Sequence, residues 1–164
     1  MRSSNNYFML LFAAAIVCTL LFPACQMRRT STQQEGGDNM DQLKITVLAG
    51  GSFCGIEKAG DIIITSGEDW ENLWEKVQNG TYPKKQLPEV DFSRETVLAV
   101  FMGTRSTGGY SIEIIRVYKK NDVIKAVAQT SSPAPGDLVT TVITQPFHIV
   151  KINTSEKTIE IVRE

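Results

Sequence analysis

Histidine and cysteine are scarce in this sequence. Of its 164 residues, one is histidine and three are cysteine. Cys18 and Cys25 lie near the N-terminus, so Cys54 and His148 alone remain for the rest of the chain. A protein zinc site takes three or four ligands, mostly His and Cys. We therefore expect no metal site and no cofactor.

The sequence also lacks an excess of charge of either sign. Lys and Arg number 17, and Asp and Glu number 18. A surface that binds nucleic acid is usually strongly basic. We therefore expect no nucleic-acid partner.

A phosphate-binding glycine loop is missing as well. Such a loop leads into a helix, whose N-terminus supplies amide donors. Here Ser106-Thr107-Gly108-Gly109 leads into the strand-like run that begins at Tyr110, and no Gly-Lys-Ser/Thr follows. This excludes nucleotide binding at the loop, and we expect no small-molecule substrate.

One nucleophilic pair is formally available, because a cysteine can be activated by a histidine. Cys54 lies in a turn-like Gly-Ser-Phe-Cys-Gly stretch, and His148 shares a strand face with Val150 and Ile152. Structural roles explain both residues better, since no third group that would orient the histidine can be identified. The sequence thus predicts a protein that is not an enzyme.

The N-terminal segment has the features of an export signal. A short start with Arg2 precedes the uncharged apolar run from Phe8 to Phe22, which is shorter than a typical membrane span. Leu21 to Cys25 resembles a bacterial lipobox, in which the cysteine is acylated and becomes the new N-terminus. The alternative is an ordinary signal peptide cleaved near Ala24.

We therefore expect residues 1–24 to be a lipoprotein signal peptide and Cys25 to carry lipid such as palmitate. Residues 25–43 are polar and aperiodic, which predicts a flexible tether, and residues 44–164 form one domain. This places the protein at a membrane of the bacterial cell envelope. Gln26 follows the cysteine, which favours the outer membrane or the cell surface over the inner membrane.

One amphipathic helix is predicted at about Gly67–Asn79. Ser66 and Asp69 form a capping box, and Asn79-Gly80 ends the helix. Apolar side chains at helical spacing share one face and are expected in the core: Trp70, Leu73, Trp74 and Val77.

Most of the remaining chain reads as strand. No helical pattern separates the strands after Gly103, and Asn121-Asp122 and Ser155–Lys157 suit hairpin turns. The alternation slips near Ile114-Ile115, which predicts a β-bulge. The fold class is thus α+β, a mainly antiparallel sheet or sandwich with the helix packed on it. The expected strands are Lys44–Leu48, Asp61–Thr65, Thr96–Gly103, Tyr110–Lys119, Val123–Thr130, Phe147–Ile152 and Thr158–Val162.

Three stretches together resemble the PrcB C-terminal domain family, named for a lipoprotein subunit of a spirochaete surface protease complex. The first stretch, from Leu87 to Ile114, matches the family pattern at Pro88, Val90, Asp91, Phe92, Gly103, Thr107, Gly108, Gly109, Tyr110, Ile112 and Ile114. The second matches at Pro133, Pro135, Gly136, Thr144, Pro146, Phe147 and His148. The opening stretch matches at Gly55, Trp70 and Trp74, with Cys54 in place of an expected Ser.

The resemblance spans about Lys44 to Ile161 and implies an accessory or stabilising subunit of a surface or periplasmic protease complex. The expected partner is therefore a protein, such as a protease or its complex. A second resemblance implies a free-standing protease inhibitor. Ser106–Ser111 is similar to the T-T-G-Y loop of chagasin-type inhibitors, which present loops from a β scaffold, although Trp is absent after Tyr110.

The glycine and proline stretches supply the candidate binding surface. Glycines let another backbone approach closely, and rigid prolines lose little entropy on association. Each of these residues also has a purely structural alternative, such as a turn. The candidate partner-binding residues are Ser106, Thr107, Gly108, Gly109, Tyr110, Pro135, Gly136, Pro146, Phe147 and His148.

Overall fold

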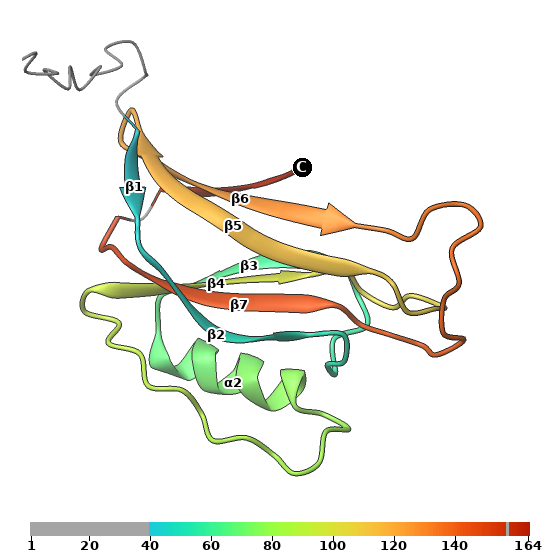
Figure 1. Cartoon of the computed structure of the whole chain (residues 1–164). Coiled ribbons are helices and arrows are strands. Elements are labelled where there is room, and N and C mark those ends of the chain that lie inside the picture. Colours follow the sequence, from blue (N-terminus) through green and yellow to red (C-terminus); the bar gives the residue numbers. More distant parts are fainter. Residues whose placement is uncertain (1–39, 157) are drawn as a thin grey trace, which may run out of the picture. The chain divides into compact units, whose positions relative to one another are not determined.

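The computed structural model describes residues 40–156 and 158–164, which form two sheets and one helix in three layers (Figure 1). The first sheet has the order β1-β5-β6-β8: Asp41–Leu43, Ser111–Lys120, Val123–Ser131 and Ile159–Arg163. The second has the order β2-β7-β4-β3: Ile45–Gly51, Phe147–Asn153, Glu95–Phe101 and Gly60–Ile64. Helix α2, Gly67–Val77, lies against the second sheet. The predicted α+β class with a mainly antiparallel sheet is confirmed.

Helix α2 begins where its capping box predicts. The Ser66 hydroxyl accepts the Asp69 amide at 3.2 Å, and Gln78 is the C-cap. The four predicted core residues are all buried. The helix ends at Val77, two residues before the predicted end, and Gly80 adopts the expected left-handed conformation with φ 77°.

Two apolar cores lie on opposite faces of the second sheet. One core packs side chains of that sheet against α2, including Trp70, Trp74 and Phe101. The other fills the space between the sheets with side chains such as Leu98, Val150 and Ile114. Strand β4 contributes to both cores, which explains its almost continuous apolar run from Thr96 to Met102.

Strands β7 and β8 do not make the hairpin predicted at Ser155–Lys157. Strand β7 lies in the second sheet, whereas β8 crosses to the first and pairs with β6 in parallel. Because β4 and β2 already flank β7, no edge is left for β8 there. The Asn121-Asp122 hairpin is confirmed, with positive φ at both residues, 50° and 60°.

The predicted β-bulge is present between Ile114 and Arg116. It places Ile112, Ile114 and Val117 in the core between the sheets, while Ile115 stays 42% exposed. The bulge therefore returns Val117 to the core but not Ile115.

The expected signal peptide and Cys25 lie outside the described residues. The expected tether overlaps them only at residues 40–43, and Asp41–Leu43 there form β1. In the described part of the chain, no helix has the length and hydropathy needed to cross a membrane.

Candidate functional site

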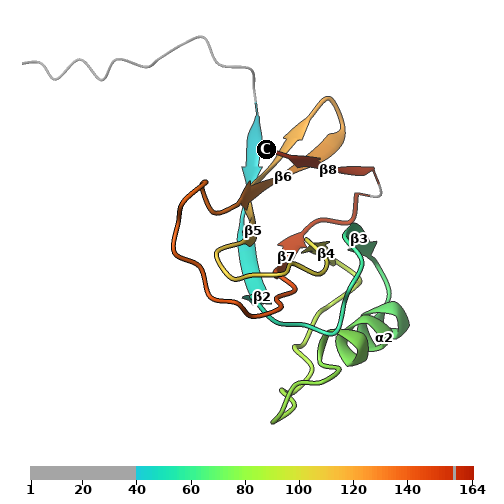
Figure 2. The same ribbon diagram turned by 90° about the vertical axis from the view of Figure 1, so that its right-hand side faces the viewer.

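Three loops meet at one end of the two sheets. They join β2 to β3, β4 to β5, and β6 to β7. The register places their flanking residues together, because Phe147 pairs with both Gly51 and Phe101, and Ser111 pairs with Ser131. Figure 1 shows this end on the right, and Figure 2 faces it. We call these segments, residues 52–59, 102–110 and 132–146, the loop end.

The glycine loop is fixed to the β6–β7 loop by hydrogen bonds. The Gly108 amide donates to the Thr140 carbonyl at 2.9 Å, and the Thr144 hydroxyl donates to the Thr107 carbonyl at 2.9 Å. Gly109 has φ 88°, and a Cβ there would lie 3.2 Å from Pro133. The glycine pair therefore shapes a contact between two loops. Within Ser106–Tyr110, only Ser106 and Gly109 are exposed.

The Pro133–Asp137 stretch forms a tight, exposed turn. The Ala134 amide donates to the Asp137 carboxylate at 2.7 Å, and the Asp137 amide donates to the Ala134 carbonyl at 3.1 Å. Pro135 and Gly136 are exposed, and Gly136 adopts φ 95°.

Directly after this turn, the β6–β7 loop presents apolar side chains that the sequence interpretation missed. Leu138 is 103% exposed and Ile143 is 62% exposed. Phe53, on the β2–β3 loop, is 60% exposed, and the Gln145 amide ties the two loops together through the Ser52 carbonyl. The sequence did carry a signal for these exposed side chains, because they are apolar residues in a loop next to Pro and Gly.

Three of the candidate binding residues face the protein interior instead. Pro146, Phe147 and His148 are buried, and the Phe147 ring stacks on Phe101 with centroids 6.3 Å apart. Tyr110 is partly buried beneath the Arg105 guanidinium, which lies 5.4 Å from the ring centroid. The exposed candidates at the loop end are therefore Ser106, Gly109, Pro135 and Gly136.

His148 links the two sheets. Its Nδ1 accepts the backbone amide of Ile114, at the bulge in β5, at 2.9 Å. An imidazole that accepts at Nδ1 carries its proton at Nε2, so this bond requires the neutral ring. Burial lowers the pKa of His148, and the nearby Glu113 carboxylate opposes that shift.

Cys54 lies on the other side of the second sheet. Its thiol packs in the core beneath α2 and donates to the Gln145 carbonyl at 3.3 Å. Burial raises the pKa of this thiol, which disfavours the nucleophilic thiolate. His148 follows Phe147, which packs in that same core, so the imidazole points to the opposite face. The two side chains do not form a dyad.

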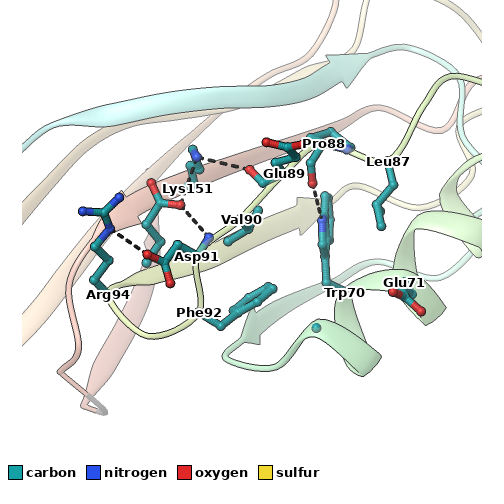
Figure 3. A pocket seen from close by; sticks show the side chains of 12 residues that line it. Trp70, Glu71, Leu87, Pro88, Glu89, Val90, Asp91, Phe92, Arg94 and Lys151 are labelled. Atoms are coloured by element: carbon teal, nitrogen blue, oxygen red, sulfur yellow. Dashed lines mark hydrogen bonds and ion pairs between the residues drawn. The ribbon is translucent and has the colours of Figure 1, made fainter.

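A cavity of about 590 Å³ lies beside α2 (Figure 3). Its wall includes the Pro88–Phe92 stretch, and its polar groups bond to one another. Trp70 Nε1 donates to the Pro88 carbonyl at 3.0 Å, and Lys151 Nζ pairs with Glu95 at 2.9 Å. The bond from the Asp91 amide and the Lys151 ammonium both lower the pKa of Glu95. These contacts anchor the segment to the sheet and helix.

Within residues 40–156 and 158–164, no group of three or more His, Cys, Asp or Glu side chains could hold a metal ion. One buried polar atom in that region has no hydrogen-bond partner, Nε of Arg105. Arg105 is held at the loop end by backbone bonds in both directions with Thr144, at 2.8 and 2.9 Å.

A comparison with known families agrees with the resemblance predicted from the sequence. The family model described as PrcB C-terminal matches residues 96–153, which run from β4 to the end of β7. The match includes the glycine loop and the whole β6–β7 loop, and it supports the expected family there. Residues 44–95 and 154–161, which the resemblance also covered, lie outside it. No curated protein and no solved structure matches the chain.

Proposed function

We propose, from the PrcB C-terminal match at residues 96–153, that this chain is a non-catalytic lipoprotein of the cell envelope that binds a protein partner. The partner is a protease or its complex, in which this chain is an accessory or stabilising subunit. The family name supports an association with a protease complex. The loop end supplies the binding surface.

Leu138 is the observation that carries this proposal. A fully exposed leucine gains about 1.5–3 kcal/mol when a partner buries it. The loop that presents it is already ordered by its bonds to Thr107, Gly108 and Ser52, so little entropy is lost on binding. An apolar side chain exposed on an ordered loop can therefore be buried by a partner at little ordering cost.

The test separates binding from folding. Full chain with Leu138→Ser is compared with wild type for capture of crosslinked partners in cells that produce it. We expect capture to fall about tenfold or more, from the lost burial. The thermal midpoint should stay close to that of wild type, because Leu138 makes no buried contact. Leu138→Met is the matched control and should retain capture. Equal capture by the serine variant would contradict the proposal.

A free-standing protease inhibitor is the second candidate. The observation that favours it is the meeting of three loops at one end of a two-sheet scaffold, which resembles the way such inhibitors present loops. Purified chain should then inhibit a papain-type cysteine protease stoichiometrically, with loss of inhibition in Leu138→Ser. An accessory subunit leaves that protease uninhibited.

A further inference from the structure

The edge of β5 nearest the loop end has no neighbouring strand. Within the described residues β5 pairs with β6 on one side, while β1 covers only Val117–Lys119 on the other. The Ile114 amide, which donates to His148, faces this open side. Ser111, Ile112 and Glu113 of β5 form one wall of a seam between the sheets.

The main-chain groups of Ile112 also point into the seam. Amide direction alternates along a strand, so Ile112 faces the same side as Ile114. The partner strand agrees, because the Thr130 amide, opposite Ile112, donates to the Glu164 carbonyl instead of to β5. Ile112, which is 3% exposed, thus has an amide donor and a carbonyl acceptor that face the seam.

The opposite wall of the seam is β2, and the space between measures about 360 Å³. Gly50 and Gly51 line it without side chains, and a Cβ at Gly50 would lie 2.9 Å from His148 Cδ2. At Gly50 the close neighbour is the His148 imidazole, so this glycine makes room for that ring. Val47, which is 59% exposed, adds an apolar surface on the same wall.

Glu113 is the only charged residue that lines this space. It forms no hydrogen bond or ion pair with the described residues, and it lies next to Ile112 on the exposed side of β5. A ligand that pairs with both the strand edge and Glu113 has a peptide backbone and a basic side chain.

We propose that the seam between β2 and β5 binds an extended, basic segment of a protein partner, which adds as a strand along Ser111–Ile114. Bonds to Ile112 supply affinity, and Glu113 selects Lys or Arg in the segment. This inference rests on the proposed function, because it requires a protein partner. The seam is a different surface from the one that carries Leu138.

The probe is a phage-displayed library of random linear dodecapeptides, selected on detergent-solubilised full chain. Enriched peptides should contain Lys or Arg. The best peptide should slow hydrogen exchange of the Ile112 amide about tenfold, the effect of one added hydrogen bond. N-methylation of single peptide amides should abolish binding at alternate positions only.

Glu113→Lys should weaken peptide binding roughly tenfold, since like charges then meet in the complex. Glu75→Lys, the same charge change on the exposed face of α2, is the matched control and should bind as wild type does. Leu138→Ser should also bind the peptide normally.

Failure to enrich any peptide would overturn the seam site. The site would also be overturned by peptides that bind the Glu113→Lys variant normally and leave the hydrogen exchange of the Ile112 amide unchanged. In either case, capture of the envelope partner that still depends on Leu138 would leave the proposed function standing. Conversely, seam binding of the peptide combined with Leu138-independent capture would contradict the role of the loop end and retain the seam.

Discussion

His148 shows how one side chain can hold two sheets together. Its Nδ1 satisfies an amide of β5 that has no strand partner, and the imidazole is buried between the sheets. An unsatisfied buried amide costs about 1–3 kcal/mol. The bond to Ile114 thus gives this histidine a structural role.

This bond predicts a loss of stability in mild acid. Because burial lowers the pKa of folded His148, the unfolded chain binds a proton more readily. The stabilisation from neutral His148 is complete at pH values above the ordinary pKa of His, which is about 6.5. It is lost as the pH falls from there towards the lowered pKa of the folded state. Urea unfolding at about pH 7.5 and about pH 5.5 should show a lower free energy of unfolding at the acid value.

His148→Asn supplies the control, because its amide oxygen can accept the Ile114 bond but does not titrate. The difference between the two pH values should shrink in this variant. An unchanged difference would show that the acid effect does not come from His148.

Cys54 is predicted to be unreactive while the chain is folded. Burial raises the pKa of its thiol and limits access, and alkylation needs an exposed thiolate. Labelling of the Cys54 peptide by iodoacetamide, followed by mass spectrometry, should accelerate more than about tenfold on unfolding in urea. Rapid labelling of the native chain would contradict the burial and reopen a nucleophilic role.

At the scale of elements, the strands and the helix follow from local patterns. Apolar side chains at i, i+3, i+4 and i+7 located α2, and the slip in alternation located the bulge. The parallel pairing of β8 was missed, because neither strand sequence nor loop length shows which sheet a strand joins. The strand β1 was also missed, since Asp41–Leu43 has one apolar residue and pairs through its backbone.

The candidate site was predicted only in part. The glycine loop and the proline turn lie at one end of the sheets, because their motifs flank strands that pair. Sequence could not show that Phe147 and His148 point inward, since both faces of the second sheet are covered. Nor could it show that Leu138 is left outside, because exposure in a long loop depends on tertiary contacts.

The contact between the two loops makes Gly109 a sensitive position. Gly109→Ala should lower the free energy of unfolding by about 1–3 kcal/mol, through positive φ and contact with Pro133. Gly60→Ala, where no atom lies within 4 Å of the added Cβ, should change it by less than about 0.5 kcal/mol. Equal effects in urea titrations would show that the loops are not packed as described.

At the scale of the whole molecule, lipidation would set where the domain works. Cys25 lies outside the described residues, and its acylation is a prediction from the apolar run and the Ala24-Cys25 pair. Metabolic labelling with palmitate should mark the wild-type chain and not Cys25→Ala. Label retained by the variant, or absent from the wild type, would refute the anchor.

The central claim is that the loop end, presented on a non-catalytic scaffold, binds a protein partner. The most direct measurement places the photo-reactive residue p-benzoylphenylalanine at Leu138 and, separately, at exposed Ser155, which follows β7 at the opposite end of the sheets. After irradiation of producing cells, position 138 should crosslink to one dominant protein, identified by mass spectrometry as a protease or a subunit of its complex. Position 155 should not crosslink to it. Crosslinks of equal yield from both positions, or none from position 138, would contradict the account.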